Sequence, residues 1–177
     1  MKATFFLLLF SASVLSAASA FAQDETAVDP AGAACGPHET KFKINVDGAA
    51  PPTVQATDSK ALVYVVEDQK FHYVNDVTMR VGLDGAWVGA NRGDSYIVFV
   101  VDPGEHHLCT DSQPGLGGGL VSLAQLKAEA GKVYYFRARI SGARDERPSL
   151  DLDRVNVDEG RFLVLHSAFS NSTPAKK

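Results

Sequence analysis

Two adjacent histidines and a cysteine lie close together in the stretch "EHHLCTD", and these residue types can bind a metal ion or activate a nucleophile. The Asp-Pro-Gly turn just before it predicts that the stretch is the return strand of a hairpin. Because neighbouring side chains on a strand point to opposite faces, His106 shares a face with Leu108, and His107 shares one with Cys109. Such a pair does not readily bind one ion. The sequence therefore predicts no metal site, although His106 and His107 are the residues that would form one.

The chain has two cysteines, Cys35 and Cys109. In an exported chain paired thiols usually become a disulfide, and we predict that these two are joined. The bridge would span 109 − 35 = 74 residues. On the chain-entropy argument such a link stabilises the fold by roughly 4 kcal/mol. A bridged Cys109 is neither a thiolate ligand nor the nucleophile of a Cys-His pair.

The first residues have the pattern of a signal peptide. A short basic start is followed by an apolar run from Phe5 to Leu15 and then by small residues. Cleavage after Ala22 fits the small-x-small rule, and cleavage after Ala20 fits almost as well. The apolar run is too short to span a bilayer comfortably, and no later segment approaches the ~20 residues needed. We therefore predict a periplasmic or secreted mature chain with no transmembrane segment.

Other patterns that could support catalysis are incomplete. The glycine loop Gly115–Gly119 lacks the Lys-Ser/Thr that follows a phosphate cradle, and no G-x-S-x-G elbow occurs. The carboxylate pairs Asp151/Asp153 and Asp158/Glu159 are typical of a solvated outer face, because acid–base work needs an apolar pocket. The sequence predicts no cofactor and a protein that is not an enzyme. The alternative is a small metal-dependent hydrolase built around His106 or His107.

The charge of the chain argues against nucleic acid as a partner. The formal net charge is −4, and removal of Lys2 with the signal peptide leaves 16 − 21 = −5. Phosphate contacts need clustered Lys and Arg, and the basic residues form no stripe.

The hydrophobic pattern predicts short strands separated by turns. In "KFKINVD", Phe42, Ile44 and Val46 share one face, which is typical of a half-buried strand. The segments 120–128 and 158–166 are compatible with either a strand or a helix, and we favour a strand for the first. The further predicted strands cover residues 61–67, 79–83, 95–101, 105–110, 132–140 and 149–157. About seven to nine short strands predict an all-β, antiparallel, Ig-like sandwich.

The same pattern predicts how the chain is divided. Residues 1–22 are the signal peptide, residues 23–40 a flexible lead-in, residues 41–166 one β-sandwich domain and residues 167–177 a disordered tail.

The run from Ala61 to about Val164 contains three characteristic pieces, "ALVYVVED", "RVGLDGAWVGANRGDSYIVFVVDPGEHHLC" and "AEAGKVYYFRARI". Because of these pieces, the run resembles a bacterial family that is called domain of unknown function 2846. The series V-x-x-D-G-x-x-V-G, from Val81 to Gly89, also resembles the PEGA type of envelope module. The resemblance implies a secreted or periplasmic bacterial β-domain, and it implies no reaction and no catalytic residues.

These observations predict an exported, non-enzymatic module that has a binding or structural role in the bacterial cell envelope. Its partner would be an envelope protein or polymer, recognised by strand addition or by a loop. Phe42 to Val46 is the candidate edge strand, and the loop that contains Gly117 is a candidate contact. Trp87 is either a core residue or a hairpin-tip side chain that stacks on a partner.

Overall fold

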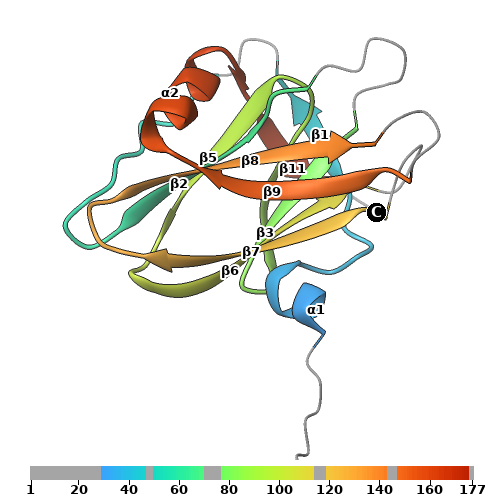
Figure 1. The fold of residues 1–177 in the computed structure, drawn as a ribbon, viewed down its shortest axis with the longest axis horizontal. Coiled ribbons are helices and arrows are strands. Elements are labelled where there is room, and N and C mark those ends of the chain that lie inside the picture. Colours follow the sequence, from blue (N-terminus) through green and yellow to red (C-terminus); the bar gives the residue numbers. More distant parts are fainter. Residues whose placement is uncertain (1–28, 47–49, 70–76, 114–118, 143–146, 176–177) are drawn as a thin grey trace, which may run out of the picture.

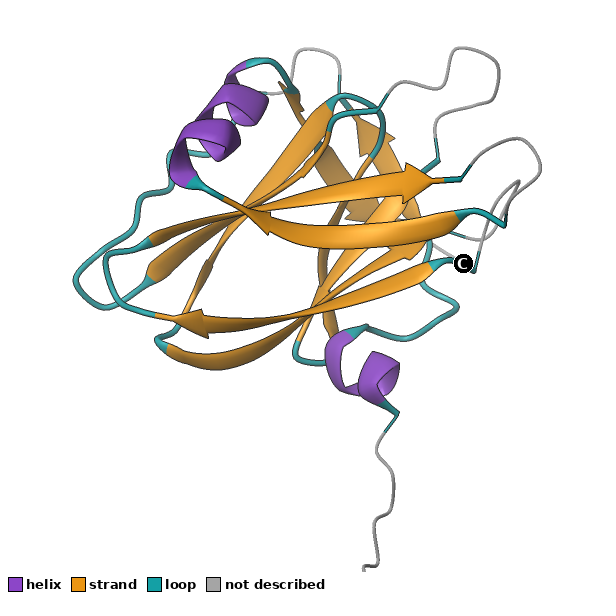
Figure 2. Cartoon of the chain, in the orientation of Figure 1, coloured by secondary structure: helices purple, strands orange, loops and turns teal. Residues whose placement is uncertain are grey.

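The computed structural model describes residues 29–46, 50–69, 77–113, 119–142 and 147–175. The predicted signal peptide and its cleavage site lie outside these residues. Among the described residues, no helix has the length and apolar character needed to cross a bilayer. The chain folds into two stacked β-sheets and a smaller third one, so the predicted all-β fold is confirmed (Figure 1, Figure 2).

The first layer is a five-stranded sheet with the order β10-β5-β2-β8-β9. Its members are β2 (Ala61–Glu67), β5 (Ser95–Val101), β8 (Val133–Ser141), β9 (Ser149–Val155) and β10 (Ala168–Phe169). β2 lies in the middle and is antiparallel to β5 but parallel to β8. β10 is also parallel to β5. The sheet is therefore mixed. The alternation of apolar and polar residues could not reveal this, because it indicates which face of a strand is buried but not which strand lies next to it.

The second layer is a four-stranded antiparallel sheet with the order β4-β3-β6-β7. It contains β3 (Met79–Leu83), β4 (Ala86–Asn91), β6 (Gly104–Ser112) and β7 (Val121–Ala128). β3 and β4 form a hairpin around Asp84-Gly85, where both residues have positive φ. The sequence of residues 120–128 was compatible with either a helix or a strand, and we favoured a strand. In the structure this segment forms strand β7.

A third, two-stranded sheet pairs β1 (Phe42–Asn45) with β11 (Asn171–Pro174), from Phe42 opposite Pro174 to Asn45 opposite Asn171. This corrects the prediction of a disordered tail at residues 167–177 as far as residues 168–174 are concerned, because β10 and β11 are both paired there. It also raises the count to eleven strands in the described residues, above the predicted seven to nine. The tail strands were missed because "SNSTP" is polar and shows no dry face.

The hydrophobic core lies between the two large sheets. It includes Val63 and Phe136 from the five-stranded sheet and Met79, Leu108 and Leu126 from the four-stranded sheet, all at most 1% exposed. Burial of apolar surface on facing sheets is the main stabilising force of such a sandwich.

The outer face of the five-stranded sheet is covered by helix α2 (Val157–Leu165). Asn156 caps it by accepting a hydrogen bond from the backbone of Glu159 at 3.0 Å. Leu163 is buried, and Gly160 lies so close to Tyr135 that a Cβ there would overlap the ring. The second ambiguous segment, 158–166, is therefore largely a helix rather than an edge strand.

Candidate functional site

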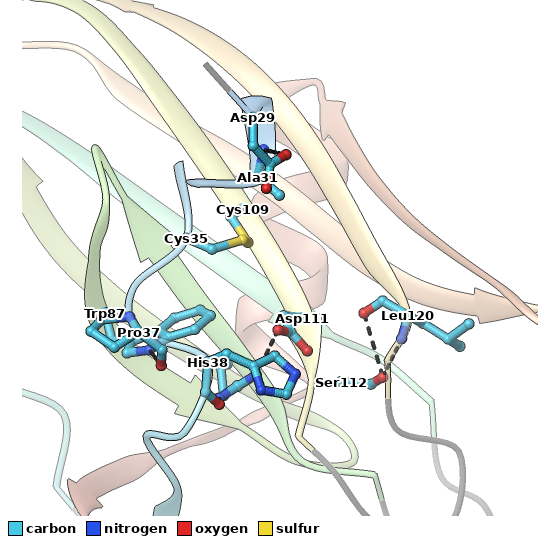
Figure 3. Close-up of a disulfide and its surroundings, with 11 residues drawn as sticks. Asp29, Ala31, Cys35, Pro37, His38, Trp87, Cys109, Asp111, Ser112 and Leu120 are labelled. Atoms are coloured by element: carbon cyan, nitrogen blue, oxygen red, sulfur yellow. Dashed lines mark hydrogen bonds and ion pairs between the residues drawn. A yellow bond between two sulfur atoms is a disulfide. The ribbon is translucent and has the colours of Figure 1, made fainter. Parts of the chain in front are cut away.

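Residues 29–41, which we name the N-terminal strap, lie against the outer face of the four-stranded sheet. Helix α1 (Pro30–Ala34) opens the strap, and Asp29 caps it by accepting a hydrogen bond from the backbone of Ala31 at 3.0 Å. Cys35 follows and forms a disulfide with Cys109 on β6, with the two Cα atoms 5.2 Å apart (Figure 3). The predicted sulfur pairing is therefore present in the structure.

The strap corrects the prediction of a flexible lead-in over residues 23–40, as far as residues 29–40 are concerned. Ala34 is only 1% exposed, and a Cβ at Gly82 of β3 would lie 2.6 Å from the carbonyl oxygen of Ala34. Gly82 thus allows the strap to approach the sheet backbone closely. The order was missed because a five-residue helix of small residues has no periodic signal.

Trp87 packs against the strap. A Cβ at Gly36 would lie 2.5 Å from the indole Cδ1 atom, and the indole Nε1 donates a hydrogen bond to the carbonyl of Pro37 at 2.8 Å. Trp87 is half-buried, and so lies between the two predicted alternatives of a core residue and an exposed hairpin-tip side chain.

Arg80 of β3 lies beneath the strap and is 0% exposed. Its Nη1 donates hydrogen bonds to the carbonyls of His38 at 2.7 Å and Thr40 at 2.6 Å, and its Nη2 donates one to Asp111 Oδ2 at 2.5 Å. The guanidinium also lies 4.4 Å from the centre of the Trp87 ring. This buried ion pair was not singled out in the sequence, where Arg80 appears as an ordinary outward-facing strand residue.

The two predicted candidate histidines lie at the other end of β6. His106 Nδ1 lies 2.6 Å from Asp84 Oδ2, and His106 Nε2 lies 2.8 Å from the carbonyl oxygen of Asp102. Both acceptors can be satisfied only when both ring nitrogens carry a proton. His106 therefore links the β3–β4 turn to the β5–β6 turn as an imidazolium.

Electrostatics favour this charged form. Burial acts to lower the pKa of His106, but the hydrogen bonds and charges of Asp84 and Asp102 outweigh it and raise the pKa above its ordinary value. Burial acts to raise the pKa of Asp84, but the backbone N–H of His107, which donates at 2.8 Å, and the nearby imidazoles lower it.

The structure does not bring the histidines together as metal ligands. The His106 side chain is 13% exposed and both its nitrogens are engaged, whereas the His107 side chain is 54% exposed. In the part of the chain that the structure describes, no group of three or more His, Cys, Asp or Glu side chains is arranged to hold a metal ion.

The predicted carboxylates do not form one site either. Asp151 on β9 accepts a hydrogen bond from the Ser141 hydroxyl at 3.0 Å, and Asp153 is exposed. Asp158 and Glu159 lie in the first turn of α2, where acidic groups interact favourably with the helix dipole.

Glu159 belongs instead to an ion-pair network on the α2 side of the five-stranded sheet. It accepts a hydrogen bond from Arg137 at 3.1 Å, and Asp68 pairs with both Arg137 and Arg139. Burial acts to raise the pKa of Asp68, but the two guanidinium groups outweigh it and lower the pKa. The network fixes α2 to β8.

The outer edge of β7 is open in the sense that no described strand pairs with it, since β7 pairs with β6 alone, although β9 of the other sheet packs close to β7. Gln125 lies opposite His107, whose carbonyl oxygen accepts a hydrogen bond from Asp84 on the β3 side. That pair is therefore not hydrogen-bonded across β6 and β7, and the N–H and C=O of Gln125 point to the open edge. Because backbone groups alternate in direction along a strand, the N–H and C=O of Leu123 also point to the open edge.

Exposed apolar side chains accompany this edge. Val121 is 44% and Leu123 is 42% exposed. A groove of about 130 Å³ lies between α1 and β7 and includes Pro30, Ala34 and Leu123 in its lining. An unpaired strand edge beside exposed apolar side chains can accept an extended peptide.

The other predicted contacts lie elsewhere. Phe42 is 8% exposed, and its strand is paired along one edge with β11. Its backbone N–H donates a hydrogen bond to the Gln113 side chain at 2.6 Å. Gly117 lies outside the described residues. Phe42 is thus a poorer candidate contact than the residues of β7.

A family model described as "Protein of unknown function (DUF2846)" matches residues 57–148, just over half of the chain, and so covers β2 to β8. No curated protein and no solved structure matched. The likeness of residues 81–89 to the PEGA module stays a prediction.

Proposed function

We propose, from the premise that the chain belongs to the DUF2846 family of proteins of unknown function, that it is a non-enzymatic binding module exported to the bacterial cell envelope. Two features support export. The disulfide between Cys35 and Cys109 suits an oxidising compartment, and residues 1–22 have the sequence pattern of a signal peptide.

The proposed binding site is the open edge of β7, and the observation that carries it is the outward direction of the Leu123 and Gln125 backbone groups. An extended segment of an envelope protein would pair with these groups and extend the four-stranded sheet. Its side chains on the outer face would then contact Val121 and Leu123, which are the exposed apolar residues of β7.

The proposal is tested by site-specific photo-crosslinking in intact cells. A photoreactive residue at position 123 should capture a partner protein. The matched control is position 100, because Val100 is 45% exposed but lies on β5 in the other sheet, opposite Leu62 of β2 and away from the β7 edge. Capture at neither position, or equally at both, contradicts the proposal.

A second variant pair isolates the backbone. Gln125→Pro removes the outward N–H, whereas Gln125→Ala removes only the side chain and keeps the N–H. With the photoreactive group at position 123, Gln125→Pro should abolish capture and Gln125→Ala should preserve it. Equal capture by both variants would mean that the partner does not pair with β7.

The rival function is the small metal-dependent hydrolase built around His106 or His107. It requires His106 to give up one of its two contacts and further ligands to approach. Elemental analysis of protein purified without chelators separates the two functions, since stoichiometric zinc favours the hydrolase.

A further inference from the structure

A second cavity, of about 280 Å³, lies between the N-terminal strap and the β6–β7 hairpin. The strap side is formed by Asp29, by Cys35 of the disulfide and by His38, and the sheet side by Asp111 and Val121. It is distinct from the groove at Leu123, and it shares only Val121 with the contacts of the proposed strand addition. Figure 3 shows Asp111 and His38 close together on the side of the strap below the disulfide.

Asp111 is a buried carboxylate with half of its hydrogen-bonding capacity unused. The residue is 4% exposed and its side chain 6%. Oδ2 accepts a hydrogen bond from Arg80, but Oδ1 is buried and has no hydrogen-bond partner within the described part of the chain. A buried carboxylate oxygen without a donor is unfavourable. The Nε of the paired Arg80 is likewise buried without an acceptor, so either a turn of the ion pair that brings Nε to Oδ1 or a donor from outside the chain would satisfy this oxygen.

The lining of the cavity supplies carboxylate acceptors beside the imidazole of His38. Asp29 lies at the strap end, where one of its oxygens caps Ala31, and none of the described residues that line the cavity is a lysine or an arginine. Arg80 compensates one of the two carboxylates, and its two terminal nitrogens are already engaged. The surplus is therefore one negative charge and several unused acceptor positions.

We propose that this cavity binds a small molecule through a primary ammonium group, which hydrogen-bonds to Asp111 and is balanced in charge by Asp29. An ammonium offers three donors and no acceptor, which complements such a lining. The volume lies just below the range of drug-sized ligand pockets, so a short chain of a few carbons fits, with Val121 and Cys35 as its apolar wall.

The same geometry makes the site conditional on the disulfide. Cys35 forms part of the wall, and its bond to Cys109 holds the strap over β6. The oxidised chain is therefore the binding form, whereas the reduced chain keeps only the noncovalent contacts of the strap.

The test is a titration of the full, disulfide-bonded chain with n-butylammonium, followed by the backbone amide NMR signals of β6 and the strap. We expect saturable shifts confined to this region. Tetramethylammonium, which has the charge but no N–H, and 1-butanol, which has a donor but no charge, should each bind more weakly by about tenfold or more, because a charge-assisted hydrogen bond is lost.

Variants locate the binding. Asp111→Asn should weaken n-butylammonium binding by about tenfold or more. Because that change also disturbs Arg80, Val121→Phe serves as a second variant, which fills the cavity from its rim. Val100→Phe is its control, since Val100 is 45% exposed against 44% for Val121. Val121→Phe should abolish the shifts and Val100→Phe should leave them unchanged.

Absence of saturable shifts overturns the proposal and leaves water as the donor to Asp111. Binding that survives Val121→Phe, or that is equally strong for tetramethylammonium, overturns it as well. These results do not depend on whether a partner pairs with β7, because the titrations use the purified chain without a partner.

Discussion

The link that His106 makes between two turns should render the stability of the domain dependent on pH. We consider His106→Phe, which keeps a ring of similar size but removes both ring N–H donors. The variant loses the hydrogen bond to Asp84 and the one to the carbonyl of Asp102. Asp84 itself is left hydrated, because its side chain is 44% exposed.

The magnitude follows from the exposure of the two partners. A hydrogen bond between charged groups contributes about 1.5–3 kcal/mol when buried, and exposure of Asp84 reduces this to about 1 kcal/mol. The neutral carbonyl of Asp102 adds about 1 kcal/mol. We therefore expect His106→Phe to lower the free energy of unfolding by about 2 kcal/mol at pH 5.5, which is about 4–8 °C in Tm.

The sign of the pH dependence is fixed by the direction of the pKa shift. The pKa of His106 is raised in the folded chain, above the ordinary value of 6.5. The charge-dependent contribution is then complete below that ordinary value and is lost as the pH rises through the folded pKa. The pKa of Asp84 is lowered, so Asp84 remains ionised at pH 5.5. The difference in the free energy of unfolding between wild type and His106→Phe should therefore fall to about 1 kcal/mol by pH 9.

The assay is urea unfolding of both proteins at pH 5.5, 7 and 9, with His107→Phe as a matched control. The His107 side chain is 54% exposed and its Nδ1 lies 3.9 Å from Asp84, so its loss should cost less than about 0.5 kcal/mol. The reasoning would be refuted if the difference in the free energy of unfolding between wild type and His106→Phe stayed constant or increased with pH. It would also be refuted if His107→Phe lowered the free energy of unfolding as much as His106→Phe does.

Three further changes test the packing around the strap and α2 by urea unfolding. Arg80→Met should destabilise the domain by about 3–5 kcal/mol, because it leaves Asp111 as a buried charge without a partner; adding Asp111→Leu should recover much of this loss. Gly160→Ala should cost about 1–3 kcal/mol through overlap with Tyr135, and a neutral result would mean that α2 shifts freely. Cys35→Ala should cost about 2–4 kcal/mol, and reductant should then have no further effect on stability.

The large elements could be predicted from the sequence because their signal is local. Each long strand shows alternation or a continuous apolar run, and each is bounded by a turn pair such as Asp84-Gly85. The placement of His106 and His107 on opposite faces of β6 follows from the same period. The disulfide could be predicted because two cysteines allow only one intramolecular pairing.

The rest depends on contacts between distant residues. Arg80 has the same local pattern as a solvated strand residue, and it is buried only because the strap folds back over β3. β11 is stabilised by pairing with β1 near the other end of the chain. The polar sequence of β11 gives no indication of this pairing. The open edge of β7 depends on strand order, which no single strand encodes.

The parallel pairing of β2 with β8 has a consequence for how the domain assembles. Leu62 lies opposite Val133, and these residues are 133 − 62 = 71 positions apart. During synthesis β2 must therefore wait, with one side of its backbone unmatched, until the chain has been made as far as Ser141. Such distant encounters make folding slow, on the order of milliseconds to seconds, and an N-terminal half made alone should be prone to aggregate.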